Sequence, residues 1–227
     1  FCALRSNTTG IRNTAVGASA LQTNTASIAN TAVGYIALCS NTTGRYNSSF
    51  GSRALRVNTT GIYNTGLGGN ALFNNTAGNS NTGIGYGTSV CNSTGDNNTA
   101  LGHQALRQNT VSNNTAVGFC ALRNNTTGNR NVAVGDNALR DNTTGRYNTS
   151  LGSSALQANS IGGGNVALGL NALLRNTTGC RNVAIGYQSQ YCVTTASNNV
   201  SVGFEALLAN TASNNTAVGC GALRNNT

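Results

Sequence analysis

The chain has 227 residues, with 29 glycines and no proline, methionine or tryptophan, and only 7% of its residues are charged. Large apolar residues are too scarce for an ordinary globular core, while the high charge and proline content of disordered chains is missing as well. Thirteen basic residues, all of them arginine, against four acidic ones give a net charge of +9, which bears on association with anionic partners rather than on fold.

A 17-residue repeat organises the chain. Its unit reads N-[TV]-A-[VLI]-G-x-x-A-L-x-x-N-T-T-G-x-x, and we number the Thr or Val after the first Asn as position 1. Two units, at Thr99 and Val200, are one residue shorter, and all units carry glycine at position 4. Thirteen in-phase copies indicate a solenoid. They begin, in chain order, at Thr14, Thr31, Ser48, Thr65, Thr82, Thr99, Thr115, Val132, Thr149, Val166, Val183, Val200 and Thr216.

Each unit predicts the same series of short elements. Positions 1 to 3 alternate as a strand does, first at 14–16 and last at 216–218, and Ala-Leu at positions 7 and 8 predicts the start of a second short strand. Gly and Asn between these segments predict tight turns. The fold class is therefore all-β: a parallel β-solenoid with one coil per repeat and stacked Asn side chains forming ladders.

The domain organisation predicted is a single array over residues 1–227, about thirteen coils long. A longer period is also present, because "NTTGRYNSSFGSRAL" at 41–55 returns as "NTTGRYNTSLGSSAL" at 142–156, an offset of 101 residues or six coils. The chain begins and ends within a repeat, so we expect it to be part of a longer fibre. The apolar content of one coil is small, which predicts that several chains pack side by side, with a homotrimer as the first expectation.

Two stretches carry a resemblance to a known repeat. "NVAIGYQS" at 182–189 and "NVSVGFEA" at 199–206 resemble the S-V-A-I-G-x-x-S repeat of trimeric autotransporter adhesin heads, the YadA-like family. The wider unit is similar to N-T-A-[IVL]-G-x-x-A-L arrays of phage and giant-virus fibre proteins. The resemblance implies a left-handed β-roll, three chains around one axis, and a place on a cell or virion surface. It also implies that positions 1 and 3, as in Val183 and Ile185, face inward, and that Gly186 turns the chain.

This chain departs from the adhesin pattern in two ways. Its unit is a few residues longer, with the excess around "NTTG", and no coiled-coil stalk or membrane anchor is visible. The outer turn is therefore expected to differ from that of the adhesin heads.

Arginine supplies the candidate contacts for a ligand. A basic column at position 9 predicts binding of an acidic polysaccharide or other polyanion, and the alternative is that arginine only keeps an amide-rich surface soluble. Nucleic acid is not an expected partner. Five more arginines, Arg12, Arg45, Arg130, Arg146 and Arg181, lie near the turn. The position-9 arginines are Arg5, Arg56, Arg107, Arg123, Arg140 and Arg224.

The Asn-Thr-Thr turns also contain N-x-[ST] sequons. If the chain enters a glycosylating pathway, these asparagines are candidates for N-glycosylation. The alternative is that an Asn- and Thr-rich ladder creates sequons by accident, in which case an inward side chain is not modified. The candidates are Asn7, Asn41, Asn58, Asn142 and Asn176.

No residue pattern predicts catalysis, a cofactor or a metal site. Seven cysteines cannot all pair within one chain, no C-x-x-C occurs, and His103 is the single histidine. Position 5 carries five aromatic residues that either point outward toward a ligand or neighbouring chain, or cap the edges of the core. They are Tyr35, Tyr86, Phe119, Tyr187 and Phe204.

The sequence therefore predicts a non-enzymatic structural segment of an extracellular fibre, at a cell or virion surface. Its expected partners are further copies of itself, in a homotrimer or filament, and surface glycans. No apolar run approaches the length that spans a bilayer, so no membrane span is expected. Two alternatives stay open: a glycan- or polyanion-binding module that uses the arginine column, and an ice-binding solenoid, against which the placement of Thr in adjacent "NTT" turns counts.

Overall fold

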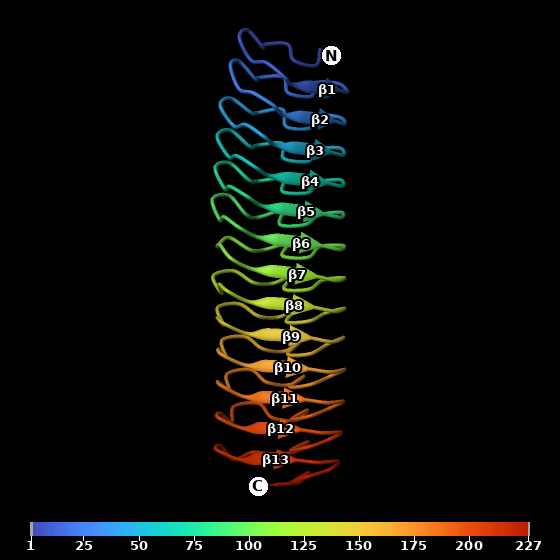
Figure 1. Cartoon of the computed structure of the whole chain (residues 1–227), viewed down its shortest axis with the longest axis vertical. Coiled ribbons are helices and arrows are strands. Elements are labelled where there is room, and N and C mark those ends of the chain that lie inside the picture. The colour runs from blue at the N-terminus through green and yellow to red at the C-terminus, as the bar shows by residue number, and fades with distance from the viewer. Residues whose placement is uncertain (1, 227) are drawn as a thin grey trace. The chain divides into compact units, whose positions relative to one another are not determined.

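The computed structural model describes residues 2–226 and shows an all-β chain of parallel strands, one per 17-residue coil (Figure 1). Its contacts divide it into two compact units, residues 1–113 and residues 114–227. The predicted parallel β-solenoid is thus confirmed. The strands of the first unit are β1 (Thr14–Val16), β2 (Thr31–Val33), β3 (Ser48–Phe50), β4 (Thr65–Leu67), β5 (Thr82–Ile84) and β6 (Thr99–Leu101). Those of the second are β7 (Thr115–Val117), β8 (Val132–Val134), β9 (Thr149–Leu151), β10 (Val166–Leu168), β11 (Val183–Ile185), β12 (Val200–Val202) and β13 (Thr216–Val218).

Strands of consecutive coils pair with equivalent positions opposite each other. Thr14 of β1 lies opposite Thr31 of β2, and Val166 of β10 lies opposite Val183 of β11. The backbone of position 1 continues the pairing, since the Thr149 N–H donates at 2.8 Å to the carbonyl of Asn165, which lies one turn further along the chain at position 17. Like residues therefore form columns along each unit, about 4.8 Å apart.

The second strand predicted at positions 7 and 8 is absent from the described coils, so this prediction was wrong. Positions 6 and 8 have positive φ angles, as at Asn137 (54°) and Leu139 (51°), whereas a strand needs negative φ throughout. The backbone still bonds from coil to coil here, because the Leu139 N–H donates to the Ala155 carbonyl at 3.0 Å. A turn that alternates the sign of φ thus replaces the strand without losing the stacking.

Glycine at position 4 permits coils to approach closely after each strand. Gly135 has a φ of 135°, in a region that L side chains rarely adopt. A Cβ added at Gly135 would lie 2.5 Å from the carbonyl oxygen of Gly152 in the next coil. Any larger residue would force the two coils apart.

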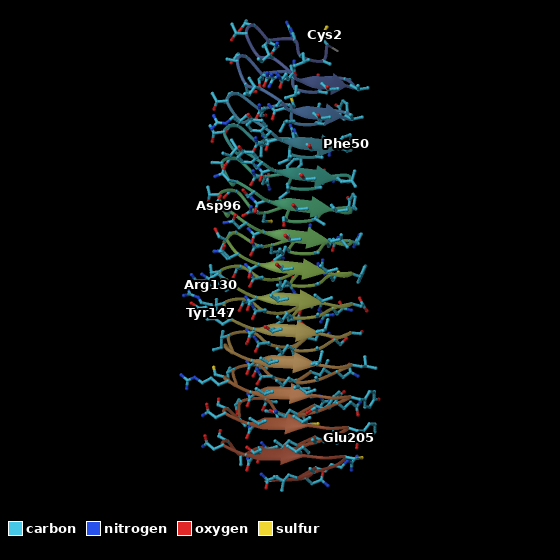
Figure 2. All side chains as sticks on the ribbon, viewed as in Figure 1. Cys2, Phe50, Asp96, Arg130, Tyr147 and Glu205 are labelled. Carbon is cyan, nitrogen blue, oxygen red and sulfur yellow. The ribbon has the colours of Figure 1, made fainter. Side chains whose placement is uncertain are left out.

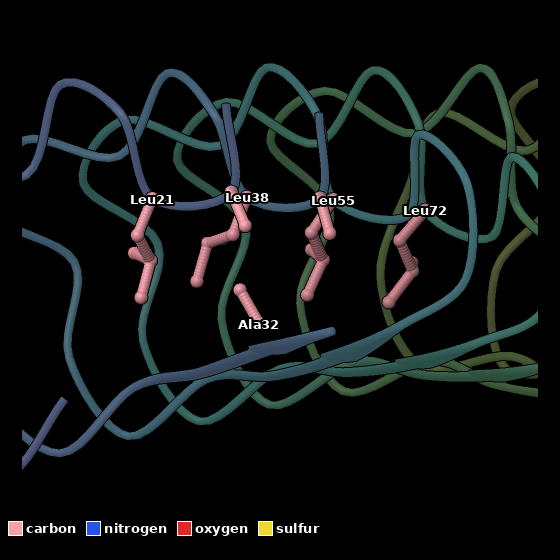
Figure 3. Packing of buried hydrophobic residues seen from close by; sticks show 7 residues of the cluster. Leu21, Ala32, Leu38, Leu55 and Leu72 are labelled. Carbon is pink, nitrogen blue, oxygen red and sulfur yellow. The ribbon is translucent and has the colours of Figure 1, made fainter. Parts of the chain in front are cut away.

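The core of each coil is narrow. Position 8 contributes a buried leucine, and positions 2 and 7 contribute buried small residues, mostly alanine. Figure 3 shows Leu21, Leu38, Leu55 and Leu72 in a row, with Ala32 facing them from the strand side. The distance between the strand and the leucine row therefore leaves room for alanine, serine or glycine at position 2 and for nothing bulkier.

Two coils replace the core leucine by a polar residue. In the coil that follows β5, Ser89 takes this position, and its buried hydroxyl has no hydrogen-bond partner. In the coil that follows β11, Gln190 takes it, and its amide donates to the Val183 carbonyl at 2.9 Å and to Ser201 Oγ at 2.8 Å. These coils lack the leucine that the others contribute, so we expect each to be a weak point of its unit.

Two columns of buried asparagine run through each unit, as the ladder prediction required. At position 11, Asn142 Nδ2 donates to Asn125 Oδ1 of the preceding coil at 2.7 Å and to the Gly145 carbonyl at 3.0 Å. At position 17, Asn131 Oδ1 accepts from the backbone N–H of Asn148 at 2.9 Å. The position-11 amide thus connects neighbouring coils and also fixes the turn in its own coil, whereas the position-17 amide bonds to the turn of the next coil, as Asn131 Nδ2 does to the Gly145 carbonyl at 2.9 Å.

Replacement of Asn142 by aspartate tests how much the ladder stabilises the chain. The carboxylate keeps the size of the side chain but cannot donate, so it would face the carbonyl of Gly145 and Oδ1 of Asn125 while buried. We expect Asn142→Asp to lower the free energy of unfolding by about 2–4 kcal/mol, measured by urea denaturation with far-ultraviolet circular dichroism. Asn171→Asp, at the half-buried position 6 of a nearby coil, is the control and should change it by less than about 0.5 kcal/mol. Equal effects of the two substitutions would contradict a stabilising ladder.

Candidate functional site

The outward side of the strands forms an uncharged surface in each unit, which we call the strand face. It consists of positions 1 and 3 of every strand. In β11, Ala184 at position 2 is fully buried, while Val183 and Ile185 are half-buried on the outer side. The expectation that Val183 and Ile185 point inward was therefore wrong, because the narrow core accepts only small residues and the larger β-branched ones must lie outside.

Large aliphatic side chains on the strand face are well exposed. In the first unit Val16 is 58% exposed and Leu67 is 46% exposed, and in the second unit Leu151 is 46% exposed. No charged residue occurs at position 1 or 3 in any of the thirteen repeats. In the first unit position 1 is Thr or Ser throughout, whereas in the second unit four of the seven strands have Val there. The strand face is thus an uncharged surface with the same spacing along each unit.

The arginines of position 9 do not form a continuous column. In the first unit Arg5, Arg56 and Arg107 are each separated by two coils with uncharged residues at this position. Three coils correspond to about 14 Å along the solenoid. In the second unit only Arg123 and Arg140 lie on consecutive coils, and Arg224 lies on the last one. Polyanion binding by these six side chains stays a prediction.

Three of these six arginines have local partners. Arg140 bonds to Asp141 through Nη2 at 2.8 Å and Nε at 3.0 Å, and this contact raises the pKa of the Arg140 guanidinium. Arg224 Nε lies 2.7 Å from Glu205 Oε2. The Arg56 guanidinium lies over the ring of Phe73, 5.5 Å from its centroid. Two of the six guanidinium groups are therefore paired with a carboxylate, and a third lies against an aromatic ring.

The opposite edge, at positions 15 and 16, carries the turn arginines and tyrosines. Figure 2 shows Arg130 beside Tyr147, where Arg130 Nη1 donates to the tyrosine hydroxyl at 2.6 Å. In the first unit, Tyr46 and Tyr63 stack on consecutive coils with 5.0 Å between ring centroids. Side chains at this edge thus pair from coil to coil.

The candidate glycosylation sites occupy the position-11 ladder. Asn41, Asn58, Asn142 and Asn176 have no exposed surface, and Asn7, in the first coil, is half-buried. Their Nδ2 atoms, to which a glycan would be attached, donate to the turn glycine of the same coil, as Asn176 does to Gly179 at 3.0 Å. A glycan at these atoms would break the ladder, so modification stays a prediction that the folded coils disfavour.

The aromatic residues of position 5 point outward. Tyr35, Tyr86, Phe119, Tyr187 and Phe204 are each between 41% and 55% exposed. Tyr187 stacks on Phe204 of the next coil at 5.3 Å, and Tyr86 stacks on His103 at 5.7 Å. Their outward orientation is thus shown, whereas contact with a ligand or a neighbouring chain stays a prediction. Aromatic rings therefore line the edge next to the position-4 glycines.

Titratable residues do not gather into a reactive group. Within residues 2–226 no cluster of three or more His, Cys, Asp or Glu side chains could hold a metal ion. All seven cysteines are free thiols, of which Cys2, Cys91 and Cys220 are exposed and Cys120 is buried. The same described part of the chain contains no helix long and apolar enough to cross a membrane.

A hollow at positions 6 and 9 of the first unit was not predicted. We call it the Gly87 hollow, since Gly87 leaves a gap where the flanking coils carry Asn70 and Gln104. Arg53 lines its wall, and this residue lies at position 6, outside the two groups of arginines that the repeat suggested. The signal in the sequence was a glycine within a column of larger residues. Whether such a glycine leaves a hollow depends on which side chains the neighbouring coils place around it.

Comparisons of the chain with protein-family models, with curated proteins and with solved structures find no match.

Alkylation by N-ethylmaleimide tests the burial of the cysteines. Burial raises the pKa of the Cys120 thiol, so less of the reactive thiolate is present near neutral pH, and only 4% of the residue is exposed. We expect Cys120 to react more than about tenfold more slowly than exposed Cys91 at pH 7.5, followed by mass spectrometry of tryptic peptides. The two rates should converge in urea, and equal rates in the folded chain would contradict the described packing.

Proposed function

We propose that this chain is a structural, non-enzymatic segment of an extracellular or virion-surface fibre, and that its strand face packs against further copies of the same chain. The observation that supports the proposal most directly is the strand face itself. It presents exposed Val, Leu and Phe side chains with no charged residue among them. A surface of this kind is typical of an interface between protein chains.

A second copy suits the strand face better than an unrelated partner. The side chains of positions 1 and 3 repeat with each coil, about 4.8 Å apart. Only a surface with the same period keeps its ridges and grooves in step with them over many coils. Another copy of this solenoid has the same period because it has the same repeat. The absence of charge at positions 1 and 3 means that two copies would meet there without repulsion between their arginines.

The narrow core gives a further reason for association. Most coils bury only one leucine and two small residues. Burying one exposed Val or Leu of the strand face on assembly would contribute roughly 1.5–3 kcal/mol. We propose a left-handed roll with three chains around one axis, following the resemblance to trimeric adhesin heads and viral fibre repeats. A closed trimer would cover the strand face of every chain.

Ice binding is a second candidate, and one observation favours it. The hydroxyl-bearing residues at position 1 of the first unit, such as Thr65 and Thr82, lie on the outer side of the sheet at a regular spacing. An ice-binding face has to stay exposed, so the candidate requires a monomer in solution. Thermal hysteresis from a monomeric chain would favour ice binding over a fibre.

The fibre proposal is tested by adding charge to the strand face. We expect the intact chain to sediment as an oligomer in sedimentation-velocity experiments. The double variant Leu151→Lys with Leu168→Lys places two ammonium groups on consecutive strands, β9 and β10, where assembly would bury them. Such burial is costly, so association should weaken by at least about tenfold.

The control adds the same charge elsewhere in these coils. Ile161 and Leu170 are exposed aliphatic residues outside positions 1 and 3, and replacement of both by lysine should leave the oligomer intact. A monomeric parent chain at every concentration tested would refute the proposal, as would equal weakening by the two double variants.

A further inference from the structure

The Gly87 hollow has a volume of about 240 Å³ and lies on the edge of the first unit, away from the strand face. It extends across four consecutive coils, whose residues at position 6 are Arg53, Asn70, Gly87 and Gln104 in chain order. A Cβ added at Gly87 would find its nearest neighbour, Gln104 Cγ, at 3.6 Å. The hollow therefore exists because one residue in a column of longer side chains has none.

Two guanidinium groups line the hollow, one at either end of the four coils. Arg53 comes from the coil of β3, and Arg107 comes from the coil of β6. The only acidic residue of the first unit is Asp96. It lies at position 15 on the opposite edge, where its carboxylate accepts from Asn79 (Figure 2). The positive charge in the hollow is thus not compensated by a carboxylate of the same unit.

An aromatic face lies beside these charges. The ring of Tyr86 is held by stacking on His103 at 5.7 Å. In the preceding coil, position 5 is Gly69, and a Cβ there would lie 3.3 Å from Tyr86 Cδ2. Glycine at position 69 therefore keeps the ring clear of a side chain from that coil. An exposed ring face attracts the polarised C–H groups of a sugar.

Two apolar side chains at position 9, Phe73 and Val90, and two amides complete the lining. Asn70 and Gln104, on the coils before and after Gly87, both border the hollow. Each amide can donate and accept hydrogen bonds, which suits hydroxyl groups, whereas guanidinium groups bind carboxylate or sulfate in a bidentate manner. The volume lies below the range of about 300–1,000 Å³ that is usual for a whole small ligand. It suits one residue of a longer chain.

We propose that the Gly87 hollow binds a carboxylated or sulfated sugar residue of an acidic saccharide chain. Arg53 and Arg107 bind its anionic groups, Tyr86 packs against its ring, and the amides of Asn70 and Gln104 bond to its hydroxyl groups. This site shares Arg107 with the position-9 arginines, but it differs from them because it also needs Arg53 and the gap at Gly87. It also lies outside the strand face, so it stays accessible when copies of the chain associate there.

The first test removes the charges. The probe is a heparin-derived tetrasaccharide, and its binding to the intact chain is measured by isothermal titration calorimetry at physiological salt. We expect Arg53→Gln with Arg107→Gln to weaken binding by about tenfold or more, because two charge-assisted contacts are lost. The matched control, Arg12→Gln with Arg45→Gln, removes the same charge from the turn edge of the same unit and should weaken binding less than threefold, by screening alone.

The second test fills the gap and keeps every charge. Position 6 has a positive φ in other coils as well, at Asn70 (57°), Gln104 (57°) and Gly87 itself (65°), so Gly87→Gln introduces a residue that this conformation accepts. We expect this variant to retain the circular dichroism spectrum of the parent and to lose tetrasaccharide binding by about tenfold. Gly221→Gln, at position 6 of the last coil, is the control and should bind as the parent does.

The outcomes separate the site from simple attraction of anions. Equal losses in the two arginine double variants, or undiminished binding by Gly87→Gln, would overturn the proposal. So would inorganic sulfate that competes with the tetrasaccharide at equal molar concentration, or a desulfated and carboxyl-reduced tetrasaccharide that binds as well as the acidic one. Because binding is measured apart from sedimentation, a monomeric chain that binds the probe would refute the fibre proposal alone.

Discussion

The structure depends on how closely one coil can approach the next. Backbone bonds join successive turns of the chain along the strand and also through the turn, as from Thr149 to Asn165 and from Leu139 to Ala155, each pair 16 residues apart. Such pairing holds the backbones about 4.8 Å apart. Gly135 and its equivalents are then required, since a Cβ would lie 2.5 Å from the next coil. The backbone hydrogen bonds thus fix the spacing between coils, and only side chains that fit this spacing can occupy the positions between them.

That spacing also explains why the interior is polar where it is. A three-residue strand cannot satisfy the backbone groups of the long turn that follows it. Buried asparagine does so, with Asn142 bonding both within its coil and to Asn125 of the coil before. Because each amide both donates and accepts, the column is satisfied at every step except where it ends or is interrupted. Val193 is such an interruption, where the repeat has valine in place of asparagine.

The sequence was sufficient for the period, the parallel stacking and the asparagine ladders, since each follows from identical residues at a fixed spacing. It was not sufficient for the side of the strand that faces the core. A pattern such as Val183-Ala184-Ile185 suggests that the large residues are inside, and only the distance to the leucine row shows that alanine alone fits. The second strand failed for a related reason: Leu139 has a positive φ, which its residue type gives no ground to expect.

The candidate sites also differ in how far the sequence alone could predict them. Arg5, Arg56 and Arg107 share a position in the repeat, but their alignment has little effect while two uncharged coils separate each pair. The Gly87 hollow arises from departures from the repeat, and it combines residues of positions 5, 6 and 9 from several coils. Only the structure shows that Arg53 lines this hollow, because that depends on which coils are neighbours.

The constant separation between bonded residues has a consequence for how such a chain grows. The backbone hydrogen bonds between coils join residues 15 to 18 apart, wherever they lie along the array. The entropy lost in closing one turn of chain is therefore the same for every coil and does not rise with total length. Folding can begin at any coil and propagate to its neighbours. Duplication of one 17-residue repeat in the gene would then add one coil. The new coil would make only contacts of the kinds that the existing coils already make.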